Sequence, residues 1–419
     1  MSQTPAMTAS VPSPSAPALR LARAGVALLV ILPLGMWLAN RSAPLVLGLA
    51  AVCLLGSALI DEGAAAVLQR LRASLRTPIG FSLATFLLWS LLTILWSHRP
   101  GPSFAMWGEL AIPLASSLAI AASGRFRPGR DENRALAVSI IAASIFMMAE
   151  LASGLSARIA LDIGKQASFV FNRPALTCVM LLPAVAAGLV IGRDRTRFDR
   201  LLCAVLALVV ATLSFDSESG AAAFGLLIML AVWLVARLLP RFALVLVGAG
   251  FVAAMLLAPV MGRLADEMMP PALHQKLAGS HTRERVDIWL SFGEAAMARP
   301  FLGAGFGTSA TLDRHPVALA VSPQHRQMLA AGHPHNAPMQ AWVETGVVGA
   351  GLLTFAGLAL LWRLQRLPAR DLAPRLALAA SAFGVATVAH GAWQGWWIAI
   401  LGLAAVWLFC SLPAEAVEG

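Results

Sequence analysis

Long, continuously apolar stretches recur along the whole of this chain, and most are close to 20 residues long. A helix needs about 20 apolar residues to cross the hydrocarbon core of a bilayer. Membrane-spanning β-strands are shorter and alternate apolar with polar residues, so these continuous runs predict helices. Only 12% of the residues are charged and 58% are hydrophobic, which leaves too little charge to cover a soluble protein of this size. The sequence therefore predicts an all-α, polytopic integral membrane protein.

We predict about twelve transmembrane helices, interrupted late in the chain by one large periplasmic loop. Transmembrane helices 1–9 are expected within residues 19–262, the loop at 263–340, and transmembrane helices 10–12 within 341–411. Residues 1–18, rich in Pro, Ser, Ala and Thr, predict a disordered cytoplasmic tail, and 412–419 a second tail. The expected spans are 20–39, 43–60, 78–97, 104–122, 134–153, 174–192, 201–216, 220–239, 242–262, 341–362, 376–392 and 395–411.

Lys and Arg are distributed unevenly between the two sides of these spans. With the N-terminus inside, 19 of the 31 fall in cytoplasmic segments and 5 in short external loops, while the large loop is too long to count. This bias predicts that both termini are cytoplasmic. The net charge of +10 is spread in small arginine groups, which orient a membrane protein, so we do not expect nucleic-acid binding.

Polar residues with possible chemical roles gather at the end of the large loop. Asn336 is a good helix N-cap and Pro338 suits a first turn, so a helix beginning there places His335 at the membrane surface. Asn336, Gln340 and Glu344 follow at every fourth position, as a polar stripe that descends into the bilayer. Polar groups at that depth normally face a cavity or another helix. We therefore interpret His335 as a functional residue, with the stripe supporting it.

Two other interpretations of His335 are open. It could cap the helix or line an interface without a chemical role. It could also bind a metal together with His333, but a zinc site needs three or four ligands and no matching Cys or acidic motif is present. We therefore expect no metal at this site.

A second cluster lies earlier in the same loop. Arg283 and Arg285 could bind a phosphate group bidentately, or could serve solubility or pair with Glu284 or Asp287. The spacing of apolar residues predicts a helix over 284–299.

A proline and three glycines follow this expected helix. Pro300 is expected to end it. The run Gly303-x-Gly305-x-Gly307 has no βαβ unit around it, so it predicts a tight turn rather than a nucleotide loop.

Two more candidates lie at external ends of spans. Arg173 is either an interfacial anchor or a ligand of phosphate, and both readings are equally compatible with its position. Glu218 belongs to the short turn Asp216–Ser219, and is either a solvated turn residue or a supporting site residue.

Together these motifs resemble the O-antigen ligase and polymerase family. His335-Asn336, followed by nine residues and Gly346-x-x-Gly349, is similar to the family signature. Arg285-x-x-x-Trp289 and Pro300-x-x-Gly303-x-Gly305 resemble its second landmark, in the same order and the same periplasmic loop. The number of spans and the late loop also fit, so the resemblance covers most of the chain.

The resemblance implies a metal-independent, inverting membrane glycosyltransferase without a cofactor. Its implied donor is an undecaprenyl-diphosphate-linked glycan, and its implied acceptor is a hydroxyl of another glycan or of lipid A-core. His335 matches the essential histidine of the family and Arg285 its loop arginine. A ligase would move a finished chain and a polymerase would join repeat units, and the shared motif does not separate them.

The chain departs from the family at one place. Members often carry a Ser-Arg pair at the external end of the span that corresponds to 201–216, and that arginine contacts the donor diphosphate. Here the chain has Ser214-Phe215-Asp216 instead. We therefore expect Arg173 or Arg283 to supply the charge, unless the donor is held differently.

Two other functions compete with a transferase. A secondary transporter also has about twelve spans, but it usually shows repeats and broken helices near the bilayer midplane. A site at the external surface favours the transferase, and one at the midplane favours transport. The missing arginine also leaves open a catalytically inactive scaffold.

Overall fold

The computed structural model describes residues 14–191, 196–269 and 282–411. Residues 1–13 of the tail expected at 1–18, and the whole tail expected at 412–419, lie outside the described residues, whereas Ala16–Ala18 already belong to the first helix. The described residues form α-helices and 3-10 helices and no β-strand, which confirms the all-α fold. The α-helices are α1 (Ala16–Leu38), α2 (Ala43–Leu75), α3 (Pro78–Thr93), α4 (Pro100–Ser123), α5 (Arg130–Ala152), α6 (Ser156–Ala160), α7 (Asn172–Val190), α8 (Arg197–Asp216), α9 (Gly220–Leu238), α10 (Pro240–Leu257), α11 (Met261–Met268), α13 (Thr282–Ala298), α14 (Pro323–Arg326), α15 (Ala337–Leu364), α16 (Ala369–Ala386) and α17 (Gly395–Ser411). The 3-10 helices are η1 (Ile94–Trp96), η2 (Ser168–Phe171), η3 (Ala258–Val260), η5 (Thr308–Arg314), η6 (Pro316–Ala320) and η7 (Gln327–Ala331).

Ten helical segments of the described chain are long and apolar enough to cross a membrane, and each coincides with an expected span. The protein is therefore a polytopic membrane protein. The two remaining expected spans correspond to α16 and α17. Helix α16 carries Arg370, Asp371 and Arg375, and α17 has only 17 residues, so neither meets both criteria. The number twelve stays a prediction.

Large apolar side chains cover the outside of the helix bundle. Leu88, Leu208 and Val245, on three different helices, are 68%, 67% and 69% exposed. Water would solvate such a surface poorly, whereas lipid chains are as apolar as these side chains. The outward face of the bundle therefore matches a bilayer.

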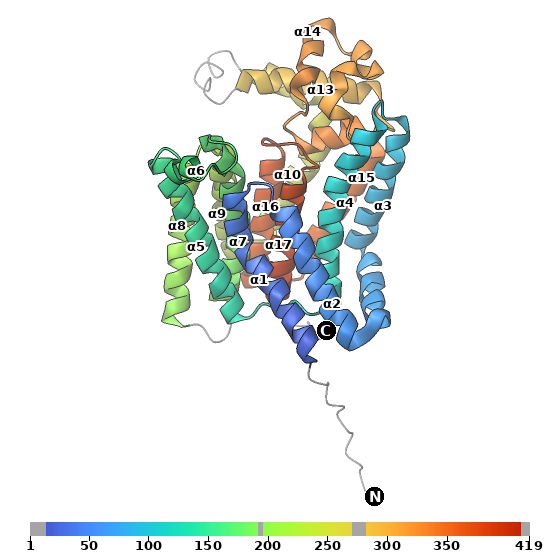
Figure 1. The fold of residues 1–419 in the computed structure, drawn as a ribbon. Coiled ribbons are helices and arrows are strands. Elements are labelled where there is room, and N and C mark those ends of the chain that lie inside the picture. The colour runs from blue at the N-terminus through green and yellow to red at the C-terminus, as the bar shows by residue number, and fades with distance from the viewer. Residues whose placement is uncertain (1–13, 192–195, 270–281, 412–419) are drawn as a thin grey trace, which may run out of the picture.

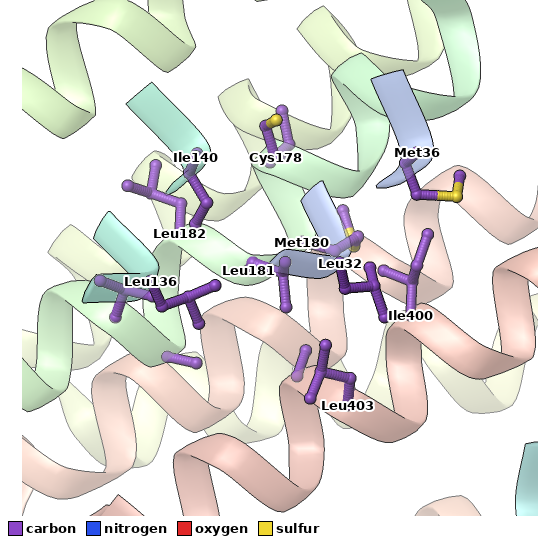
Figure 2. Close-up of a cluster of buried hydrophobic side chains, with 14 of the residues drawn as sticks. Leu32, Met36, Leu136, Ile140, Cys178, Met180, Leu181, Leu182, Ile400 and Leu403 are labelled. Carbon is purple, nitrogen blue, oxygen red and sulfur yellow. The ribbon is translucent and has the colours of Figure 1, made fainter. Parts of the chain in front are cut away.

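Helix α7 lies at the centre of the bundle. Its most apolar stretch is 83% buried, against at most 44% for any other of the ten segments. Leu32 of α1, Leu136 of α5 and Leu403 of α17 pack around its residues Met180 and Leu181 (Figure 2). This close packing fixes the position of the first turn of α7, which carries Arg173.

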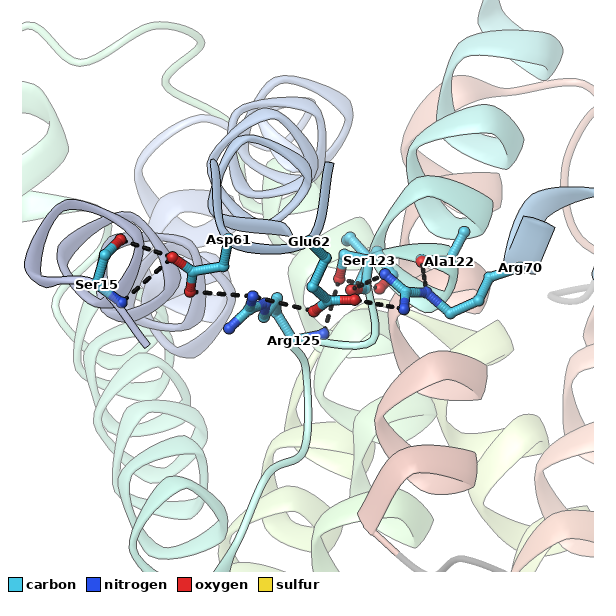
Figure 3. A network of polar contacts seen from close by, with 8 residues as sticks. Ser15, Asp61, Glu62, Arg70, Ala122, Ser123 and Arg125 are labelled. Carbon is cyan, nitrogen blue, oxygen red and sulfur yellow. Dashed lines mark hydrogen bonds and ion pairs between the residues drawn. The ribbon is translucent and has the colours of Figure 1, made fainter. Parts of the chain in front are cut away.

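A polar network ties helices together at the end of the bundle opposite α13 and α14 (Figures 1 and 3). Arg125, just after α4, forms ion pairs of 3.0 Å with both Asp61 and Glu62 of α2. Arg70 pairs with Glu62 at 2.6 Å, and the Ser15 hydroxyl donates to Asp61 at 2.6 Å. Helix α2 ends at Leu75, beyond the expected span end at 60, and is kinked at Gly63, where φ is 78° and ψ is 169°. The network thus holds the two parts of α2 on either side of this kink against the end of α4.

The expected large loop is itself mostly helical. Helix α13 coincides with the helix predicted over 284–299, and Pro300 follows its end as expected. Phe292 of α13 packs with Leu312, Leu329 and Met339 in a small hydrophobic core that joins the loop to the start of α15. The loop helices α13 and α14 therefore form a structured layer over one end of the bundle (Figure 1).

Helix α15 is interrupted at Gly346, where φ is 64° and ψ is −168°. The turn after α13 pairs with the chain at this interruption: Ala304 N–H donates to the Val343 carbonyl at 2.7 Å, and Val347 N–H to the Pro300 carbonyl at 2.8 Å. A Cβ atom on Gly346 would lie 2.1 Å from the Phe301 carbonyl oxygen. The glycine run 303–307, with positive φ at all three glycines, is the tight turn predicted from the sequence.

Candidate active site

A cavity of about 1060 Å³ opens beneath the loop layer. Its walls are helix ends and connections: the α1–α2 turn, the segment before α7, the first turns of α7 and α9, α13, the residues before α15, and the α16–α17 connection. Four of the predicted site residues line it, namely Arg173, Glu218, Arg285 and His335. Residues far apart in the sequence therefore meet in one chamber at one end of the bundle.

His335 occupies this cavity in a fixed orientation. Its Nδ1 atom lies 2.7 Å from the carbonyl oxygen of Ala389. A carbonyl can only accept a hydrogen bond, so Nδ1 carries the proton and Nε2 of the neutral ring keeps its lone pair. His335 also has a φ of 51°, which is uncommon for a residue other than glycine. The site thus holds a histidine tautomer that can accept a proton at Nε2.

The start of α15 explains the position of His335. Asn336 caps this helix as predicted: its Oδ1 accepts a hydrogen bond from the Met339 N–H at 2.9 Å. The Asn336 side chain is fully buried and does not line the cavity. Its role in the structure is to place His335 directly before the helix.

Four basic side chains line the cavity: Arg41, Lys165, Arg173 and Arg285. Arg285 Nη1 donates to the Val388 carbonyl at 2.7 Å, and the Arg173 guanidinium lies 5.4 Å from the centre of the Trp396 ring. Within the described part of the chain, no ion pair joins any of the four to an acidic side chain. The cavity therefore has a surplus of positive charge for an anion.

Glu218 is the acidic residue of the cavity wall. It accepts a hydrogen bond from the Ser168 hydroxyl at 2.5 Å, which joins the turn before α9 to η2. This contact leaves the second carboxylate oxygen of Glu218 for a ligand or for water.

Arg283 does not line the cavity. It pairs with Asp266 at 2.7 Å and with Asp287 at 2.9 Å, and more than half of its side chain is exposed. Residues two apart on a helix point about 200° from one another, so Arg283 and Arg285 cannot face the same ligand. The sequence left open whether Arg283 binds phosphate or pairs with Asp287. The structure contains the pair with Asp287.

Gln340 and Glu344 are buried behind the cavity rather than lining it. Gln340 Oε1 accepts a hydrogen bond from the Ala392 N–H at 2.9 Å, and Glu344 Oε2 accepts one from the Trp393 indole N–H at 2.8 Å. The polar stripe of α15 therefore faces the α16–α17 connection.

Two further histidines, His333 and His390, line the cavity beside His335. Burial, followed by the proximity of the other histidines, lowers the pKa of His333 to about 4. Burial also lowers the pKa of His390 to about 4. Both rings are therefore neutral near pH 7. In the described ranges, no group of three His, Cys, Asp or Glu side chains is placed to hold a metal ion.

Sequence reasoning missed part of this site. Arg41 and Lys165 were counted only as external charges. Their expected position on the external side was the sequence signal that could have assigned them to this site. The carbonyl groups of Val388 and Ala389 carry no sequence signal, because every residue has one.

Comparisons with known proteins find a family model and several relatives to which this chain is similar. Residues 202–354 match the family model described as O-Antigen ligase. The chain is 24% identical to "Putative polysaccharide ligase RP358" of Rickettsia prowazekii over 49% of each chain. It is 22% identical to "Putative polysaccharide ligase" of Rickettsia felis over 80% of this chain and 81% of the relative. The match thus spans about half the length of the first relative and most of the second. The family resemblance predicted from the motifs is confirmed.

Proposed function

We propose, from the similarity of this chain to the O-antigen ligase family, that it transfers a glycan from an undecaprenyl-diphosphate carrier to an acceptor hydroxyl in surface polysaccharide biosynthesis. The observation that carries the proposal is the convergence of His335, Arg285 and Arg173 on one cavity. The cavity lies at the end of the bundle whose loop layer is predicted to be periplasmic. The protein would then act at the periplasmic face of a bacterial inner membrane.

The basic residues fit the donor. A diphosphate leaving group gains negative charge as its bond to the sugar breaks, and fixed cations stabilise that charge most effectively where water is partly excluded. Arg285 and Arg173 are half-buried, and neither forms an ion pair with an acidic side chain in the described chain. They therefore take the role of the arginine missing near Asp216, without a metal ion.

His335 fits the acceptor side of the reaction. Its Nε2 lone pair can take the proton of the acceptor hydroxyl while the hydroxyl oxygen bonds to the anomeric carbon. The bond from that carbon to the diphosphate oxygen breaks at the same time, so the sugar inverts and undecaprenyl diphosphate leaves. The proton then passes from His335 to solvent.

A glycan ligase is favoured over a secondary transporter. Every wall of the cavity is a helix end or a connection, which supports a site near one end of the bundle, whereas transporters bind their substrates near the midplane. The names of the curated relatives favour a ligase over a polymerase. The proposed acceptor is a hydroxyl of another glycan or of lipid A-core.

A genetic experiment tests the function. The gene is deleted in its host and replaced by wild type, His335→Ala, Arg285→Ala, Arg173→Ala or the control Arg314→Ala, whose side chain is exposed in the loop. Membrane amounts are compared by immunoblot and surface polysaccharide is sized on gels. We expect the first three variants to lose polysaccharide attachment and the control to keep it. Full-length unattached chains indicate a ligase and single lipid-linked repeats a polymerase, whereas full restoration by a stable His335→Ala protein overturns the proposal.

A further inference from the structure

The most completely hydrogen-bonded acidic side chain near the site is Glu344, which is fully buried. Its Oε2 atom accepts hydrogen bonds from the Gly307 N–H at 2.7 Å and the Trp393 indole at 2.8 Å. Its Oε1 atom accepts from the Gln340 amide at 3.0 Å and the Ser309 N–H at 3.3 Å. All four partners are donors, so the arrangement suits a carboxylate with two accepting oxygens.

Glu344 and Gln340 together anchor the α16–α17 connection. Trp393 is held directly by Glu344, and the Ala392 N–H is held by Gln340 Oε1 at 2.9 Å. The amide of Gln340 is in turn oriented by its hydrogen bond to Glu344. The connection, residues 387–394, has no regular helix. Backbone hydrogen bonds to Val385 hold Val388 and Ala389 to the end of α16, and the contacts of Gln340 and Glu344 hold the residues that follow.

The same connection orients both reactive side chains of the cavity. Its Val388 carbonyl accepts a hydrogen bond from Arg285, and its Ala389 carbonyl accepts one from His335, each at 2.7 Å. The Ala389 carbonyl also selects the tautomer in which Nε2 of His335 is free. A shift of this connection would therefore misplace the base and the donor-binding arginine together.

We propose that Glu344 is a positioning residue of the transfer reaction, which fixes the 388–393 segment and thereby the orientation and tautomer of His335. This inference rests on the proposed function. Glu344 does not line the cavity, and it would act on the 388–393 segment through Trp393 and Gln340.

The Glu344→Gln variant tests the proposal with little change in volume. It replaces one accepting oxygen with an NH₂ group that points at existing donors, so the anchor at Trp393 or Gln340 is lost. Because a displacement of about 1 Å can lower a rate about 100-fold, we expect glycan transfer to fall about 10- to 100-fold. Glu267→Gln, on the exposed side of α11, is the matched control and should transfer at the wild-type level.

A spectroscopic readout separates positioning from mere stability. Protein labelled with ¹⁵N-histidine is placed in nanodiscs, and the His335 signals are assigned by comparison with His335→Asn. In the wild type we expect His335 protonated at Nδ1, and in Glu344→Gln a substantial Nε2-protonated population. An unchanged tautomer, or a loss of transfer that only follows the amount of folded protein, overturns the positioning role.

The outcome is distinguishable from failure of the proposed function. If His335→Ala still transfers glycan, the function itself is wrong. If His335→Ala is inactive while Glu344→Gln transfers normally, only the inference about Glu344 fails. A double variant, Glu344→Gln with Trp393→Phe, tests whether the two residues act together. Because Trp393→Phe already removes the indole donor, the double variant should lose less glycan transfer than the product of the two single losses.

Discussion

The Nδ1 atom of His335 and the carbonyl oxygen of Ala389 lie 2.7 Å apart, although 54 residues separate them in the sequence. This hydrogen bond fixes which ring nitrogen carries the proton. A substitution can therefore separate the structural role of His335 from its chemical role. Asparagine has a side-chain N–H near the position of Nδ1 but has no basic nitrogen at the position of Nε2.

We predict that His335→Asn folds normally and binds undecaprenyl diphosphate, but transfers glycan at least about 100-fold more slowly, since general-base catalysis contributes about 100- to 10,000-fold. Thermal unfolding and binding of a fluorescent undecaprenyl diphosphate in nanodiscs measure the first two properties. Radiolabelled glycan transfer in membranes measures the third. Transfer at more than about a tenth of the wild-type rate would argue against a basic role.

Arg283 and Arg285 provide a matched pair within one helix. Arg285 lines the cavity, whereas Arg283 is paired with Asp266 and Asp287 outside it. A charged hydrogen bond to a phosphate contributes about 1.5–3 kcal/mol, so Arg285→Ala should weaken binding of undecaprenyl diphosphate about 10- to 100-fold. Arg283→Ala should bind within about twofold of wild type. Equal losses in both variants would contradict the assignment of Arg285, and not Arg283, as the donor-binding residue of α13.

Local patterns in the sequence predicted the spans, the helix α13 and the Asn336 cap, because each depends on neighbouring residues. They did not decide between Arg283 and Arg285, since the choice depends on which face of α13 meets the cavity. They also missed the role of the α16–α17 connection, whose carbonyls meet His335 and Arg285 only through the tertiary fold. Glu344 was recognised as part of a polar stripe, but its distant partner Trp393 could not be inferred.

Gly346 and Gly351 lie on the same helix, and we predict opposite effects on stability when each is replaced by alanine. Gly346 has a φ of 64° and no room for a Cβ atom beside Phe301, whereas a Cβ on Gly351 meets nothing within 4 Å. Gly346→Ala should lower the melting temperature by at least about 2 °C, because the φ of 64° and ψ of −168° lie in a backbone region that is essentially restricted to glycine and costs other residues about 1–3 kcal/mol. Gly351→Ala should leave it unchanged or raise it slightly, since alanine favours a helix.

Scanning fluorimetry of both glycine variants in the same detergent provides the comparison. We also expect Gly346→Ala to reduce glycan transfer, because the turn 303–307 pairs with α15 at this glycine and donates to Glu344. A Gly346→Ala protein as stable and active as Gly351→Ala would show that the interruption of α15 is not required.

His315 predicts how stability depends on pH. Its side chain is 3% exposed, and its Nδ1 accepts a hydrogen bond from the Val317 N–H at 3.0 Å. Burial, then the nearby His98 and Arg299, lowers the pKa of His315 from 6.5 to about 4. Between these values the unfolded chain binds a proton that the folded chain excludes, so the folded state loses stability as the pH falls from 6.5 towards 4.

His315→Asn keeps an acceptor for the Val317 N–H but does not titrate. Its melting temperature should therefore fall less than that of wild type between pH 7 and pH 5, with equal slopes between pH 7 and pH 8. Part of the acid sensitivity should remain in the variant, because burial also lowers the pKa of His98. Parallel melting curves at every pH would show that His315 can be protonated without disturbing the fold.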